Sequence, residues 1–132
     1  LEIVARQSAQ ILTLSSPILD VGEHVLAVPL IGDFDGARAA ELTPTLLTAV
    51  VERRIRAVIL DVTGISDLDP AGAGQLARLI GALRLLGAEG IVTGISPRLA
   101  QTLGALGNDA GLLRTYRSLS DGLRASSARP SG

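Results

Sequence analysis

The sequence contains no cysteine, methionine or tryptophan, and it has a single phenylalanine and a single tyrosine. Without cysteine the chain can form neither a disulfide nor a thiolate metal site, and it has no cysteine nucleophile. This composition fits a reducing compartment, so we expect a cytoplasmic protein. With aromatic residues at only 2%, the chain also lacks the stacking surface that single-stranded nucleic acids require.

Strong charge and long apolar runs are missing as well. The formal net charge of −1 provides no general basic surface for DNA or for an anionic membrane. No run of about 18 uncharged apolar residues is present, so the sequence predicts no transmembrane segment. We therefore expect neither a nucleic acid nor a membrane as a partner.

Aliphatic residues are abundant instead. Apolar residues make up 47% of the chain, and the mean hydropathy is +0.41. A chain of 132 residues is long enough for one domain with a real core, which here must consist of Leu, Ile, Val and Ala. The sequence shows no internal repeat and no linker that would divide it.

The two ends differ from the middle. Val4, Ile11 and Leu14 recur at helical spacing, which is typical of one face of an amphipathic helix. We expect residues 1–16 to be the end of a longer linker helix, residues 17–124 to form the folded domain, and the small, polar residues 125–132 to be a flexible tail.

Strands and helices alternate along the domain, which predicts an α/β fold in the order β-β-α-β-α-β-α-β-α. Such alternation implies a mixed sheet of four to five strands, mostly parallel, with an antiparallel hairpin strand at one edge and helices packed against it. Pro44 is unfavourable inside a helix, which leaves open a later start for the first helix. The predicted strands are 18–21, 24–31, 58–61, 90–93 and 112–116, and the predicted helices are 35–54, 70–86, 96–107 and one that begins at 118–123.

The apolar residues of the first predicted helix indicate which of its faces is buried. They recur every three or four residues, as on the buried side of a surface helix. They are Leu42, Leu46, Leu47, Val50 and Val51.

The segment 61–70 is the most informative part of the chain. It connects an apolar strand to a long apolar helix through a short polar turn, and in α/β proteins such turns often display the working residues. Asp69 is a favourable N-cap, and Pro70 suits the first helical position, where its missing N–H is not needed.

The other candidates for chemistry have simple structural explanations. His24 is the only histidine and is expected at a surface turn. The pair Gly72 and Gly74 does not complete a dinucleotide-binding or phosphate-binding motif. Thr102 alone suggests only a half-exposed helix residue. Five aspartates could be imagined as a metal or acid-base cluster, but two of them, Asp35 and Asp69, already have roles as helix caps. The five are Asp33, Asp35, Asp61, Asp67 and Asp69. We therefore predict no catalytic residue, no metal and no cofactor.

Four separate motifs resemble those of a STAS domain, in particular the C-terminal STAS domain of RsbR-type stressosome proteins. They occur in collinear order and cover residues 17–124. The motifs are Val-Pro-Leu-Ile-Gly-Asp-Phe-Asp at 28–35, Ile-Leu-Asp-Val-Thr-Gly at 59–64, Leu-Leu-Gly-Ala at 85–88, and Thr-Gly-Ile-Ser-Pro at 93–97 followed by Ala-Gln-Thr at 100–102.

This resemblance implies a non-enzymatic scaffold that regulates signalling. In that family an N-terminal sensory domain joins the STAS domain through a helix, which would account for residues 1–16. The implied partners are an RsbS-type STAS protein and an RsbT-type switch kinase. The implied assembly is a homo-oligomer, either a dimer or a larger shell.

The resemblance also implies two phosphoacceptor positions. One matches Pro70, which has no hydroxyl and so has lost the site, and the other matches Thr102, the candidate that remains. Asp69 matches the family's own aspartate and is no phosphate mimic. The implied partner-binding loop comprises Ser66, Asp67, Asp69, Pro70 and Gly72.

Two other functions stay open. A stand-alone anti-anti-sigma factor would share the fold, but it normally carries Ser or Thr at position 70 and does not need the linker helix. A small α/β enzyme or ligand-binding domain would use the carboxylates between Asp61 and Asp69, and a nucleotide, lipid or metal bound to purified protein would favour it.

Overall fold

The computed structural model describes residues 17–104 and 114–128. The predicted order of strands and helices is confirmed within these residues. The linker helix predicted for residues 1–16 lies outside the described part, as does the predicted end of the fourth motif's helix near residue 107. The elements are β1 (Leu19–Gly22), β2 (Val25–Asp33), α2 (Gly36–Glu52), β3 (Ala57–Asp67), α3 (Pro70–Leu85), β4 (Glu89–Thr93), α4 (Pro97–Gly104), β5 (Arg114–Tyr116) and α5 (Leu119–Ala128).

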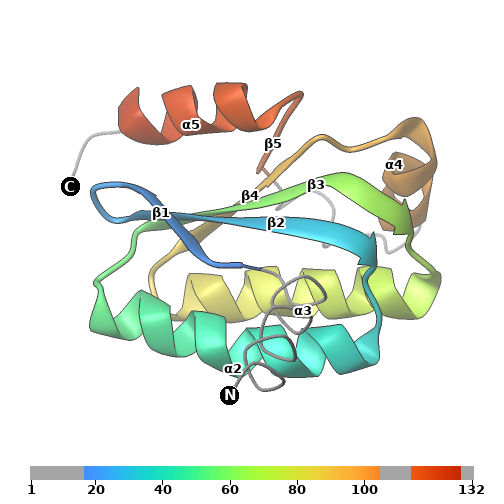
Figure 1. Ribbon diagram of the computed structural model, residues 1–132, viewed down its shortest axis with the longest axis horizontal. Coiled ribbons are helices and arrows are strands. Elements are labelled where there is room, and N and C mark those ends of the chain that lie inside the picture. The colour runs from blue at the N-terminus through green and yellow to red at the C-terminus, as the bar shows by residue number, and fades with distance from the viewer. Residues whose placement is uncertain (1–16, 105–113, 129–132) are drawn as a thin grey trace, which may run out of the picture.

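The strands form one mixed sheet in the order β1-β2-β3-β4-β5. The predicted edge hairpin is confirmed, because β1 pairs with β2 antiparallel, whereas β2, β3, β4 and β5 are parallel neighbours. Helices α2 and α3 cover one face, α5 covers the other, and α4 lies near the carboxyl ends of the strands (Figure 1).

The core has two parts because β2 and β3 are buried on both faces. Leu26, Val28 and Leu30 of β2 belong to the larger cluster, under α2 and α3. The alternate residues Val25 and Ala27 belong to the smaller cluster, with which residues of α5 pack. Continuous apolar runs of this kind are expected in parallel strands that are covered on both sides.

Helix α2 begins at Gly36, directly after the N-cap Asp35, so the predicted start at Asp35 is confirmed. It continues through Pro44 and ends at Glu52, two residues before the predicted end. The cap and the burial of Leu42 hold the first turns, so the helix does not start later. Val51 was expected on the inner face, but it is 61% exposed because the buried stripe of α2 ends at Val50.

Two further boundaries were set too early. Strand β3 continues to Asp67 instead of ending at Asp61, because β2 extends beside it as far as Asp33. Helix α5 continues to Ala128, so residues 125–128 are helical and do not belong to the tail. The hydroxyl of Ser126, which is buried, donates a hydrogen bond to the carbonyl of Gly122 over 2.8 Å. In the described part of the chain, none of the helices has the length and apolarity to cross a membrane.

Candidate partner-binding site

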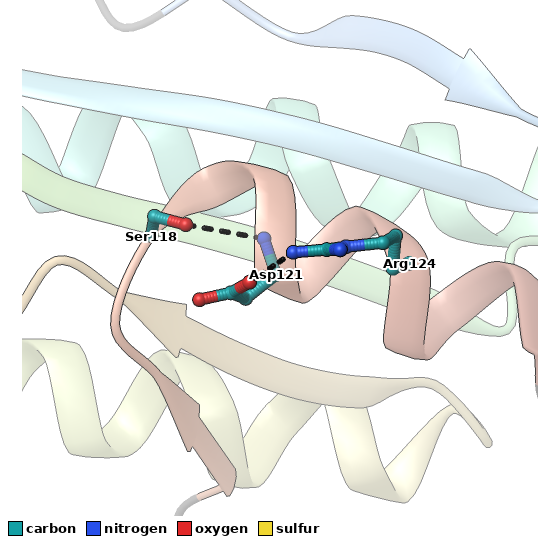
Figure 2. Close-up of polar contacts among 3 residues, drawn as sticks. All are labelled: Ser118, Asp121 and Arg124. Carbon is teal, nitrogen blue, oxygen red and sulfur yellow. Dashed lines mark hydrogen bonds and ion pairs between the residues drawn. The ribbon is translucent and has the colours of Figure 1, made fainter.

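The loops at the carboxyl ends of the parallel strands lie at one edge of the molecule, and each leads into a helix (Figure 1). A short polar side chain caps each helix. Asp35 accepts a hydrogen bond from the N–H of Arg38, and Ser96 accepts one from Leu99 over 3.1 Å. Figure 2 shows the same arrangement at α5, where the Ser118 hydroxyl accepts from the Asp121 N–H and Asp121 pairs with Arg124. We call this edge, formed by the four loops, the carboxyl edge.

The β3–α3 loop forms the centre of the candidate site. The carboxylate of Asp69 accepts a hydrogen bond from the N–H of Gly72 over 2.7 Å, and Pro70 occupies the first helical position. Both roles are as predicted from the sequence. Asp69 and Pro70 are exposed, so this helix start is accessible to a partner.

Gly72 has a different role from its neighbours in the predicted loop. It is buried, and a Cβ atom at this position would lie 2.4 Å from the carbonyl oxygen of Phe34 and 2.9 Å from Leu68. Real Cβ atoms do not approach a backbone oxygen so closely, so the site requires glycine. Gly72 therefore holds α3 against the β2–α2 loop and offers no side chain to a partner.

Ser66 and Asp67 form the last residues of β3. Asp67 lies opposite Asp33 in the parallel register of β2 and β3. Residues 66–69 thus run from the end of the sheet directly to the cap of α3.

Arg38 fixes the neighbouring β2–α2 loop. Its guanidinium donates hydrogen bonds to the carbonyls of Ile31 and Asp33, the latter over 2.9 Å. The sequence did not single out this residue. The one signal in the sequence is its position, one turn into the helix that follows a strand. Many arginines share this position without donating to the carbonyls of the preceding strand.

Thr102 lies on α4, at the same edge. It is half-buried, and its hydroxyl donates to the carbonyl of Arg98 over 3.2 Å. Leu99 and Leu103, on the adjacent face of the helix, are buried in the larger core cluster. The candidate phosphoacceptor is therefore a helix residue next to a buried face.

Among residues 17–104 and 114–128, the aspartates form no group of three or more side chains that could hold a metal ion. Asp61 accepts hydrogen bonds from the hydroxyls of Thr63 and Thr93, over 2.9 and 2.8 Å. Thr93 lies opposite Asp61 in the register of β3 and β4 and is fully buried. Asp61 thereby ties the two strands together, a role that the sequence alone did not reveal.

His24 lies at the β1–β2 turn, as predicted. Its φ of 64° is unusual for a residue other than glycine, and its Nδ1 atom is 3.0 Å from the carbonyl oxygen of Arg54. The carbonyl of His24 in turn accepts from Arg56 over 2.8 Å. His24 thus joins the hairpin to the α2–β3 loop, at the edge opposite the candidate site (Figure 1).

Known proteins share the sequence pattern and the fold of this chain. The chain is 34% identical to the RsbT co-antagonist protein RsbRA of Bacillus subtilis over 121 residues, which are 92% of this chain and 44% of RsbRA. The chain thus spans less than half the length of that relative.

Solved structures share the fold. A variant of RsbS from Moorella thermoacetica superposes with a TM-score of 0.72 at 23% identity, covering 86% of this chain and 98% of RsbS. A chain of the stressosome, a signal integration and transduction hub, superposes with a TM-score of 0.69 at 22% identity. The match covers 86% of this chain and 100% of that chain.

The model of one family, the STAS domain, matches residues 16–122. This range contains all the motifs from which the resemblance was drawn, and it runs from before β1 into α5. The resemblance to STAS domains and to RsbR-type proteins is thus confirmed. The chain belongs to the STAS domain family.

Proposed function

We propose that this chain is the STAS module of an RsbR-type co-antagonist in a bacterial stressosome-type partner-switching system. In this role it is a non-enzymatic signalling scaffold that binds an RsbS-type STAS protein and an RsbT-type switch kinase. The observation that carries the proposal is the similarity to the RsbT co-antagonist RsbRA over 92% of this chain. The N-terminal sensor, the dimer or larger shell and the cytoplasmic location belong to the same proposal, because the chain spans only 44% of RsbRA.

The partner surface of this proposal is the carboxyl edge. Its centre is the exposed helix start at Asp69 and Pro70, which Gly72 and the carbonyl of Phe34 hold in place. The first N–H groups of a helix and its dipole give this end a partial positive charge. Helix α4 with Thr102 forms the second part of the surface.

A phosphate would have different effects at the two phosphoacceptor positions of the family, 70 and 102. At position 70 the phosphate would lie at the positive end of α3, where the helix dipole favours negative charge. Thr102 instead lies in the second turn of α4, which begins at Pro97. Phosphorylation there would remove the hydroxyl's bond to the carbonyl of Arg98 and place a charged group next to the buried Leu99 and Leu103. We therefore expect a switch that loosens α4.

The two alternative functions have no such support. A stand-alone anti-anti-sigma factor normally needs a hydroxyl at position 70, and Pro70 has none. For a ligand-binding or catalytic domain, the carboxylate of Asp61 would have to act on a ligand, but it already accepts two hydroxyl groups within the sheet.

Phosphorylation tests the proposal directly. The chain is incubated with an RsbT-type kinase and Mg-ATP, and peptides are analysed by mass spectrometry. We expect one phosphate in the wild type, none in Thr102→Ala, and an additional one at residue 70 in Pro70→Thr. Thr45→Ala is the matched control, because the Thr45 hydroxyl makes the same type of bond, to the carbonyl of Glu41 over 3.3 Å.

Two outcomes would contradict the proposal. If a kinase that phosphorylates another STAS protein adds no phosphate to the wild type or to Pro70→Thr, the chain is not its substrate. If Thr45→Ala and Thr102→Ala both retain the phosphate, the switch lies elsewhere.

A further inference from the structure

The face of the sheet under α5 is open along its β1–β2 side. Helix α5 packs mainly on β3, β4 and β5, and Figure 1 shows it displaced from the carboxyl end of β2. Leu19 and Ile31 are 43% and 60% exposed. Both point to this face, because their neighbours Ile18 and Leu30 belong to the core on the opposite side. Together with the half-buried Pro29, they form what we call the open strip.

The chain enters the sheet beside this strip. Leu19 lies opposite Ala27 and Asp20 opposite Leu26, so the antiparallel register brings Pro17 to the level of Pro29. If the chain before Pro17 continues along this register, it reaches the level of Ile31. Leu14 is three residues before Pro17 and can lie at most about 10 Å from it. Ile31 is two strand residues, or about 7 Å, beyond Pro29.

The sequence before Pro17 has the complementary pattern. Val4, Ile11 and Leu14 recur on one face of a helical segment, and such a stripe needs an apolar surface to cover it. A helix of 14 residues would be about 21 Å long. The strip from Leu19 to Ile31 extends over four residues of β2, or about 13 Å, so the lengths are compatible.

We infer that residues 1–14 of this chain dock on the open strip through their apolar stripe. The segment then also shields the outer edge of β1, which pairs only with β2 among the described strands. The inference goes beyond the proposed function and does not depend on it.

Docking here would connect the start of the chain to the candidate site. The carbonyl of Ile31 accepts a hydrogen bond from Arg38, and two residues later Asp33 lies opposite Asp67, the last residue of β3. A displacement of the docked segment would therefore act on the end of β2 next to the partner surface.

Amide hydrogen exchange, measured by mass spectrometry on the whole chain, tests the inference. We expect amides of residues 1–14 to exchange at least about tenfold more slowly than in an unstructured peptide, independently of protein concentration. Ile31→Asp should remove this protection. Val51→Asp is the matched control, since Val51 is 61% exposed at the far end of α2, and it should leave the protection unchanged.

A second variant, Leu14→Asp, disrupts the same contact by changing the docked segment and leaving the sheet intact. It is the deciding variant if Ile31→Asp also lowers the protection of amides in α3, since Ile31→Asp would then disturb more than the contact. The inference is wrong if residues 1–14 are unprotected in the wild type, or if neither Ile31→Asp nor Leu14→Asp reduces their protection. Protection that disappears on hundredfold dilution would also overturn it, because the strip would then be covered by a second copy of the chain.

Discussion

Gly72 allows the first turn of α3 to lie close against the β2–α2 loop. Its backbone approaches the carbonyl of Phe34 so closely that a methyl group would lie 2.4 Å from that oxygen. The neighbouring Asp69 caps the same turn. Asp69 and Pro70 could be assigned from residue type and order alone, because caps are local. The contact with Phe34 could not, because it joins two loops that are distant in sequence.

Replacing Gly72 by alanine should destabilise the domain by about 1–3 kcal/mol, since a backbone carbonyl must move to make room. Gly81→Ala in the same helix is the matched control, because nothing lies within 4 Å of a Cβ atom there. It should stabilise the domain by about 0.5–1 kcal/mol through helix propensity. Urea unfolding measures both. Equal stabilisation by the two changes would contradict the close packing at Gly72.

At the scale of elements, α2 carries an internal cost. Pro44 has no N–H to donate to the carbonyl of Ala40, yet the helix continues from Gly36 to Glu52. The Asp35 cap and the buried Leu42 and Leu46 compensate for the missing bond.

Pro44→Ala should therefore stabilise the domain by about 1–3 kcal/mol, because it restores the hydrogen bond and removes the clash of the ring with the preceding turn. Pro44 is exposed, so the change leaves the core intact. Thermal unfolding of the two proteins measures the effect. A lower melting temperature for the variant would contradict the view that Pro44 costs α2 stability.

The order and type of the elements could be predicted because Asp, Ser, Pro and Gly mark helix starts and ends locally. The errors arose where distant partners decide. The predicted strand ended at Asp61 before a short polar turn, but β3 continues to Asp67 because β2 extends beside it. Val51 fitted the apolar spacing, although the core ends one residue earlier. The roles of Arg38 and Asp61 depend on carbonyls and hydroxyls that only the folded chain brings near.

At the scale of the molecule, the net charge of −1 is not separated into an acidic end and a basic end. The carboxyl edge exposes Asp33, Asp35 and Asp69, but it also exposes Arg98 and Arg117. The opposite end exposes Arg53 and Arg54 after α2, but it also exposes Glu52. A partner for the carboxyl edge is therefore expected to contact individual groups there, because no field of one sign would orient it.

Calorimetric titration of the chain with an RsbT-type kinase tests the central claim most directly. The wild type should bind. Ala71→Arg, at the exposed first turn of α3, should weaken binding at least about tenfold, or about 1.4 kcal/mol. Ala40→Arg, at an exposed position of α2, should not change it. If the wild type does not bind a kinase that binds another STAS protein, or if Ala71→Arg binds equally well, the proposed partner surface is wrong.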